Sequence, residues 1–287
     1  MVLTSGENSL RAENISKIVT GFALQAYKMK QLCMEDSSSA WQETYYREGA
    51  SELTGGASAS IRGVPRLAGF PHAEPNWTKI SSFIEKYGVE GTISAEDALT
   101  NNIPMIARTL LRIGRAVANA VDIQIEATLN ADAGNALAVA SGNEWDSATV
   151  ANRDPVQDIL NAKKLIAEDN YDTDNGNGFL ILSPKDYANL LGNTKIVSNP
   201  TFRAADIVAN GVVGQILGLK IIVSNVVTAD QAYVVIAKEA LTWKSVTPLT
   251  VKTIEDAGIK WTIRAWEMGV TQTPNPNAIC EITNTAA

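Results

Sequence analysis

The sequence contains few of the residues from which redox, metal or nucleophilic sites are built. Its 287 residues include one histidine, His72, and two cysteines, Cys33 and Cys280. A Cys–His pair or a zinc site needs such residues in contact or at a set spacing, and these three are far apart in the sequence. One cysteine pair, whether or not it forms, is no disulfide framework for so long a chain, which favours a reducing compartment. We expect no enzyme, no metal and no cofactor.

Long apolar runs and an excess of basic residues are missing as well. No apolar stretch approaches the roughly 18 residues that cross a bilayer, so we expect no membrane partner. The 24 Lys and Arg residues against 31 Asp and Glu residues give a formal net charge of -7. A dedicated nucleic-acid binder should be basic instead. This balance does not exclude a container that holds nucleic acid without gripping it.

Two glycine-containing segments suggest ligand loops but depart from the known motifs. Residues 172–178 (DTDNGNG) begin like a calcium loop, yet Asn177 and Ser183 occupy the positions where an EF-hand needs glycine and glutamate. Residues 211–218 space their glycines loosely like a phosphate loop, but no Lys-Ser/Thr pair follows and no helix opens there. We interpret the first segment as a polar turn before a strand and the second as a turn into a strand.

The first 80 residues predict two projecting segments. Residues 1–40 carry a weak helical pattern and end in a polar run, which we interpret as an arm. Residues 41–78 contain five glycines among small residues, between Trp41 and Trp77. Glycine offers no side chain to bury, so this stretch predicts a long two-stranded loop, and loops beyond about 15 residues are usually functional or disordered. Neither segment belongs to an obvious core.

The loop carries charges of both signs, which have two interpretations. They are either solvated or paired with charges of an adjacent subunit. The candidates for such contacts, with the aromatic residues at both ends of the loop, are Trp41, Arg47, Glu48, Glu52, Arg62, Arg66 and Trp77.

The strongest local pattern is a long amphipathic helix. Ser94 is a predicted N-cap with Asp97 at the third helical position. Apolar residues then recur at spacings of three and four from Leu99 to Leu129, which predicts one buried stripe. Pro104 removes a backbone donor and should kink or restart the helix near Asn102. The part after Pro104 would be about 39 Å long at 1.5 Å per residue.

The second half of the chain alternates helices and strands. A cap followed by proline predicts helices after Asp154 and after Ser183. Apolar runs predict strands at residues 179–182, 219–223, 233–236 and 277–282. Alternating residues on both sides of residues 255–258 predict a hairpin. The class is α+β without internal repeats.

The order of these features resembles that of the Hong Kong 97-type major capsid proteins of tailed viruses, over nearly the whole chain. Residues 178–186 (GFLILSPKD) resemble the strand that feeds an axial-domain helix of that family. Residues 214–224 (GQILGLKIIVS) resemble its element of two glycines, a strand and a serine, and residues 261–266 with 276–279 resemble its C-terminal ending. Each string is weak alone, so the resemblance depends on their order.

The resemblance implies a division of the chain into the parts of that fold. They are an N-terminal arm (1–40), an extended β-hairpin loop (41–80), a peripheral domain (81–150 and 242–276) with its spine helix (94–130), and an axial domain (151–241 and 277–287). The family's covalent lysine–asparagine crosslink is not expected, because the chain has no lysine between Lys30 and Lys79.

The implied function is self-assembly into hexamers and pentamers of an icosahedral shell. The shell would enclose double-stranded DNA, contact it non-specifically and form in the host cytoplasm as the capsid of a virion. The implied partners are a separate scaffolding protein, a portal and a decoration protein. Three alternatives stay open at this point: an encapsulin-type compartment, an α+β enzyme with an unrecognised site, and a tail or adhesion protein.

Overall fold

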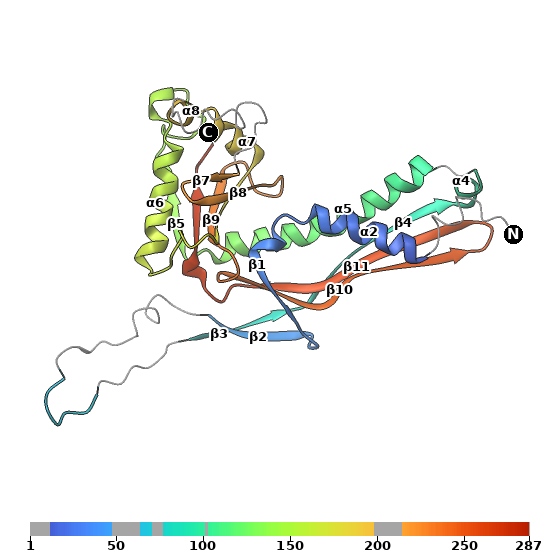
Figure 1. Ribbon diagram of the computed structural model, residues 1–287, viewed down its shortest axis with the longest axis horizontal. Helices are drawn as coiled ribbons and strands as arrows, with labels where there is room; N and C mark the ends of the chain where they lie inside the picture. Colours follow the sequence, from blue (N-terminus) through green and yellow to red (C-terminus); the bar gives the residue numbers. More distant parts are fainter. Residues whose placement is uncertain (1–11, 48–63, 71–76, 101–102, 198–213, 287) are drawn as a thin grey trace.

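The computed structural model describes residues 12–47, 64–70, 77–100, 103–197 and 214–286. Figure 1 shows an L-shaped subunit with a compact part, which contains α6 and α7, and an elongated part, along which α5 runs. A narrow ribbon of two strands, β2 and β3, lies below the elongated part in this view. The layout is that of a molecule with extended, unpartnered surfaces.

The elongated part is built on a four-stranded sheet in the order β1-β10-β11-β4. Its strands are β1 (Cys33–Ser37), β10 (Leu241–Asp256), β11 (Lys260–Gln272) and β4 (Glu85–Ser94). β10 and β11 form the predicted hairpin, which turns at Gly258 with a φ of 76°. The hairpin is confirmed and is longer than its alternating residues indicated, because β10 and β11 pair from Thr242 with Gln272 to Asp256 with Lys260, with two register shifts between Ser245 and Thr250.

The predicted amphipathic helix is confirmed, together with its break. The Ser94 hydroxyl accepts a hydrogen bond from the Asp97 backbone N–H at 3.1 Å and caps α4 (Ala95–Leu99). α5 (Ile103–Asp132) then begins with Pro104 in its first turn, where the missing N–H costs nothing. The stripe from Ile106 to Leu129 is buried. It packs against β4 and β11 in its first half and reaches the compact part in its second half.

The N-terminal segment corrects one expectation. α2 (Ala12–Ala26) lies along α5, and its residues Ile15, Val19 and Ala23 are fully buried. At Gly114 of α5 an added Cβ would lie 2.9 Å from the Val19 carbonyl oxygen, so glycine permits this close approach. β1 then adds to the edge of the four-stranded sheet. The interpretation of residues 1–40 as an arm outside any core is therefore wrong for residues 12–37. Residues 1–11 lie outside the described ranges.

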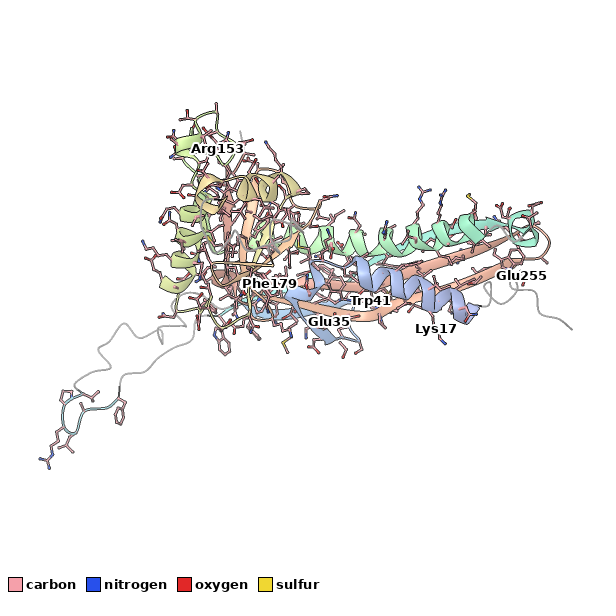
Figure 2. The ribbon with its side chains drawn as sticks, turned by 45° about the horizontal axis from the view of Figure 1, so that its top comes forward. Lys17, Glu35, Trp41, Arg153, Phe179 and Glu255 are labelled. Carbon is pink, nitrogen blue, oxygen red and sulfur yellow. The ribbon has the colours of Figure 1, made fainter. Side chains whose placement is uncertain are left out.

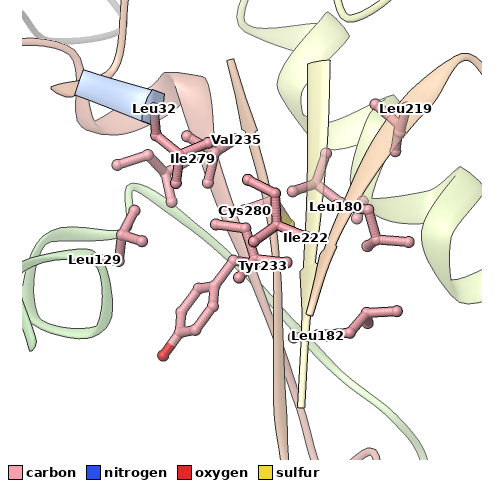
Figure 3. Close-up of a cluster of buried hydrophobic side chains, with 14 of the residues drawn as sticks. Leu32, Leu129, Leu180, Leu182, Leu219, Ile222, Tyr233, Val235, Ile279 and Cys280 are labelled. Carbon is pink, nitrogen blue, oxygen red and sulfur yellow. The ribbon is translucent and has the colours of Figure 1, made fainter. Parts of the chain in front are cut away.

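The compact part is a six-stranded sheet with helices packed on it. The strand order is β5-β12-β9-β6-β8-β7. The strands are β5 (Asn135–Ala138), β12 (Ile279–Thr283), β9 (Gln231–Ile236), β6 (Gly178–Leu182), β8 (Leu219–Val223) and β7 (Gln215–Ile216). Figure 3 shows side chains of β6, β8, β9 and β12 meeting Leu129 of the spine helix in one buried cluster. This shared core joins the two parts of the subunit.

The helices of the compact part begin where their caps predicted. Asp154 accepts a hydrogen bond from the Gln157 N–H at 3.3 Å and starts α6 (Pro155–Glu168). Ser183 accepts one from the Asp186 N–H at 3.1 Å and starts α7 (Pro184–Leu191). Shorter helical turns are α8 (Thr194–Val197), η1 (Lys30–Leu32), η2 (Val150–Asn152) and η3 (Pro276–Ala278).

Two predicted boundaries shift. Residues 135–150 were assigned to the peripheral domain, but β5 pairs in parallel with β12 in the compact sheet. Trp145 is fully buried there and donates its indole N–H to Asp158 at 2.9 Å. The last strand starts at Ile279 rather than at residue 277, because Pro276 opens η3. The compact part therefore takes in the chain that directly follows α5.

Candidate assembly surfaces

The β2–β3 ribbon, formed by β2 (Gln42–Arg47) and β3 (Thr78–Phe83), is the base of the predicted extended loop. The strands are antiparallel, with Gln42 opposite Phe83 and Arg47 opposite Thr78. Exposed and half-buried residues alternate along β2 and along β3 from Lys79 onward. Because side chains alternate between the faces of a strand pair, one face of the ribbon lies against the subunit and the other is open to solvent.

The inner face is anchored to the subunit by polar contacts. Arg47 forms an ion pair with Asp132 at the end of α5, with 2.6 Å between Nη2 and Oδ2. Its Nε donates to the Thr273 carbonyl oxygen at 3.3 Å. Gln272 of β11 donates its side-chain N–H to the Ser82 hydroxyl at 2.9 Å. Arg47 therefore has an ion-pair partner within its own chain, whereas the sequence analysis considered it either solvated or paired with an adjacent subunit.

The outer face, which we call the aromatic face, carries Tyr46, Trp77 and Phe83. These side chains are 55%, 53% and 67% exposed. The rings of Tyr46 and Trp77 lie 5.9 Å apart between centroids, so they form one patch. Trp41, which immediately precedes β2 and is labelled in Figure 2, is 66% exposed. A group of exposed apolar side chains of this kind on the surface of a subunit marks an interaction site.

The remaining predicted contact residues fall into two groups. Arg66 is exposed in the described segment 64–70, which lies far from the rest of the subunit in Figure 1. Leu67 and Phe70 of this segment are 101% and 89% exposed. Glu48, Glu52 and Arg62 lie outside the described residues. Tyr46 and Phe83 were not among the predicted contacts, although alternation of aromatic and polar residues within the strands could have placed them on one face.

The cysteines sit in environments that suppress thiol chemistry. Both are reduced and buried, and Cys280 lies within the cluster of Figure 3. Burial raises the pKa of the Cys280 thiol to about 12 and raises the pKa of the Cys33 thiol further. A thiol that does not ionise near neutral pH is a poor nucleophile. His72 lies outside the described residues.

The two glycine-containing segments are turns, as predicted. Within residues 172–178, Asp172 accepts from the Asp174 N–H at 2.8 Å, and Asp174 pairs with Lys163 at 2.5 Å. The described part of the other segment, residues 214–218, turns into β8 through Leu217 and Gly218, whose φ values are 49° and 82°. No helix within the described ranges is long and apolar enough to span a membrane.

A buried ion pair ties the N-terminal segment to the long hairpin. Glu267 of β11 is fully buried, and its Oε1 lies 2.6 Å from Lys30 Nζ. Tyr27 donates its hydroxyl to the same carboxylate. Burial, reinforced by the Glu267 charge, raises the pKa of this phenol. Three polar groups thus satisfy one another where α2, η1 and the sheet meet.

Comparisons with known proteins agree with this architecture. The family model described as phage capsid protein matches residues 78–282, which is more than half of the chain. No curated protein matches the sequence.

Many solved structures share the fold at low sequence identity. A virus-like particle protein from Pyrococcus furiosus aligns with a TM-score of 0.62 and 13% identity, over 94% of this chain and 98% of the other. The capsid of cyanophage P-SCSP1u gives 0.65 and 14%, over 90% and 88%. Mycobacterium phage Che8 gives 0.58 and 17%, over 99% and 93%.

The family match and the shared fold together identify the protein family and the fold. The α+β architecture with a spine helix, a long hairpin and a two-stranded ribbon at the base of the predicted loop is the one that the resemblance implied. Assembly into an oligomeric shell, and a place in the capsid of a virion, follow from the family. The chain belongs to the phage capsid protein family and is a Hong Kong 97-type major capsid protein, the subunit of an icosahedral shell.

Proposed function

We propose that this chain assembles into hexamers and pentamers whose shell encloses a double-stranded DNA genome, and that the aromatic face is a principal contact between subunits. The observation that carries the proposal is the two-faced β2–β3 ribbon. Its inner face is fixed by Arg47 and Ser82, while Tyr46, Trp77 and Phe83 stay exposed. A surface that is anchored and still unpartnered suits a binding site that a neighbour completes.

The size of the aromatic face supports a role in assembly. Large aromatic side chains bury about 150–250 Å² each and dominate interface energetics. Tyr46, Trp77 and Phe83 are 53–67% exposed, so somewhat more than half of that area is open to a partner, out of the roughly 800 Å² that each partner buries in a stable interface. Exposed charges contribute about 0–1 kcal/mol per pair. The rings of the ribbon should therefore matter more than Glu48, Glu52, Arg62 and Arg66, which remain proposed secondary contacts.

The other proposed properties follow from a shell built of such contacts. A separate scaffolding protein guides assembly in the host cytoplasm, a portal admits the DNA, and a decoration protein binds the finished shell. Subunits are held without covalent crosslinks, since no lysine lies between Lys30 and Lys79. The chain is not an enzyme. In support, both thiols are buried with raised pKa values.

An encapsulin-type compartment has the same fold but encloses a protein cargo. The match to the phage capsid family favours the viral shell. The two are separated by what the particles contain when they are purified from cells that make the complete set of capsid proteins.

The test is to express the chain, alone and with its scaffold, and to image the product by negative-stain electron microscopy. We expect closed shells of icosahedral symmetry, and in particles from infected cells we expect DNA that resists added nuclease. A monodisperse monomer or dimer under all conditions of salt, pH and scaffold would contradict the proposal. Closed shells that contain protein cargo and no DNA would establish the compartment instead.

A further inference from the structure

A groove opens where the spine helix meets the compact part. It has a volume of about 750 Å³ and lies between α2, α5 and the loop that follows β8. Lys28, Arg112 and Arg115 line it together with Asn119 and Asn225. Figure 1 shows α5 leaving the compact part at this inside corner of the L. Neither the aromatic face nor the hairpin contributes to the groove.

The cations of this groove are free to bind an anion. Arg112 and Arg115 are exposed, and so is Arg108, one turn before Arg112 on the same side of α5. Within the part of the chain that the structure describes, none of these three guanidinium groups has a carboxylate within ion-pair distance. The Lys28 ammonium group donates a hydrogen bond to the Val223 carbonyl oxygen, and the carboxylate whose charge acts on it is Asp122.

The one carboxylate that lines the groove is already engaged. Asp122 is only 3% exposed. Its oxygens accept the backbone N–H groups of Lys28 at 2.9 Å and of Met29 at 3.1 Å. Burial raises the pKa of Asp122, while the backbone N–H groups that it accepts act in the opposite direction. The field in the groove is therefore set by the lysine and the arginines.

The sequence segments around the groove contain basic residues and no acidic ones. The chain carries a net charge of -7, yet residues 14–34, 100–121 and 207–229 contain no Asp or Glu. These segments include Lys28, Arg112 and Arg115, the basic residues that line the groove, and also Arg108. A positive surface within an acidic protein is a local feature that net charge hides.

From this charge distribution we infer that the groove binds the phosphate backbone of double-stranded DNA and is the place where the shell contacts its genome, which rests on the proposed function. Arg108 to Arg115 span about 10 Å of helix at 1.5 Å per residue. Over that length duplex DNA presents about six negative charges at one per 1.7 Å. Asn119 and Asn225 supply further donors. Contacts to phosphate carry no sequence information, so we expect binding that is independent of sequence.

The test compares Arg112→Gln/Arg115→Gln with a matched variant, Lys164→Gln/Lys238→Gln. The second pair also removes two exposed positive charges, but from α6 and from a turn of the compact part. A fluorescein-labelled 30-base-pair duplex of arbitrary sequence is titrated with each unassembled full-length protein between 50 and 200 mM salt. Fluorescence anisotropy gives the affinity, and circular dichroism checks that each variant is folded.

We expect the groove variant to bind more weakly and the plot of log affinity against log salt to become less steep by about 1.8, since each lost phosphate contact removes about 0.9. The matched variant should keep the native slope. Equal slopes for all three proteins would overturn the inference. It would also be overturned if the groove variant bound DNA normally but no longer formed shells, because the groove would then be a protein contact. Because the titration uses unassembled protein, its result does not depend on whether shells form. If the double variant fails to fold, Arg108→Gln alone should lower the slope by about 0.9, and no change in slope would then count against the groove.

Discussion

Helix α2 and the β2–β3 ribbon both pack on the outside of the long elements α5 and β11. They differ in that α2 buries its apolar side chains, whereas the ribbon leaves its aromatic side chains exposed. α2 buries Ile15 and Val19 completely against α5. The ribbon makes polar contacts to the subunit and leaves Tyr46 and Trp77 more than half exposed. This difference indicates that α2 is part of the folded subunit and that the ribbon is available to a neighbouring subunit. Stability should respond to changes in α2, and assembly to changes in the ribbon.

The largest effect is expected where α2 is buried. Val19→Asp places an unpaired carboxylate in the apolar interface, at a cost of several kcal/mol. We expect loss of soluble yield and of the helical signal in circular dichroism. Ile18→Asp is the matched control, because Ile18 is the neighbouring residue and is 37% exposed; it should fold normally. Equal tolerance of both changes would mean that α2 is an arm after all.

The next largest effect is expected at the buried ion pair. Glu267→Gln removes the buried partner of Lys30 and leaves the more distant, exposed Glu35, and breaking a buried pair typically costs about 3–5 kcal/mol. A urea titration followed by tryptophan fluorescence measures the change in the free energy of unfolding. Asp36→Asn is the control, because the Asp36–Lys244 pair lies on the surface, and no measurable change is expected. If Glu267→Gln were as harmless as the control, the junction would not depend on this pair.

A smaller effect on stability is expected at the ribbon's anchor. Arg47→Ala removes the ion pair to Asp132, which is partly exposed and should be worth about 1 kcal/mol. We expect a slightly lower melting temperature but a marked loss of shell yield, because the ribbon would no longer be held in a fixed orientation relative to the subunit. Arg47→Lys retains the charge and should restore part of the yield. Normal yield from Arg47→Ala would show that the anchor does not orient the ribbon.

The sequence was informative wherever one local pattern determined the structure. The caps at Ser94, Asp154 and Ser183 and the stripe of α5 follow from residues within a few positions of one another, and all are confirmed. β5 was missed because its partner β12 lies more than a hundred residues away, and a four-residue strand with one large apolar residue, Leu137, has no distinctive pattern. Long-range pairing leaves little trace in local sequence.

The candidate site was predicted in part for the same reason. Trp41 and Trp77 stood out as aromatics that flank a glycine-rich stretch. Phe83 shares a face with Trp77 because side chains alternate along one strand. Tyr46 joins them only because Gln42 pairs with Phe83, and a shift of one residue between the strands would put Tyr46 on the opposite face. The partner of Arg47 within the chain was not predicted, because Asp132 belongs to a helix that is distant in sequence. Register and tertiary packing decided each case.

The most direct test of the division between subunit and assembly is the double variant Tyr46→Ser/Trp77→Ser, examined by thermal melting and by electron microscopy of the same sample. We predict a melting transition close to that of the native chain, because both side chains are more than half exposed, together with failure to close shells. Leu160→Ser, which changes an exposed apolar residue on α6, should leave both properties unchanged. Normal shells of native stability from the double variant would contradict the account, since the aromatic face would then not be the contact that joins the subunits.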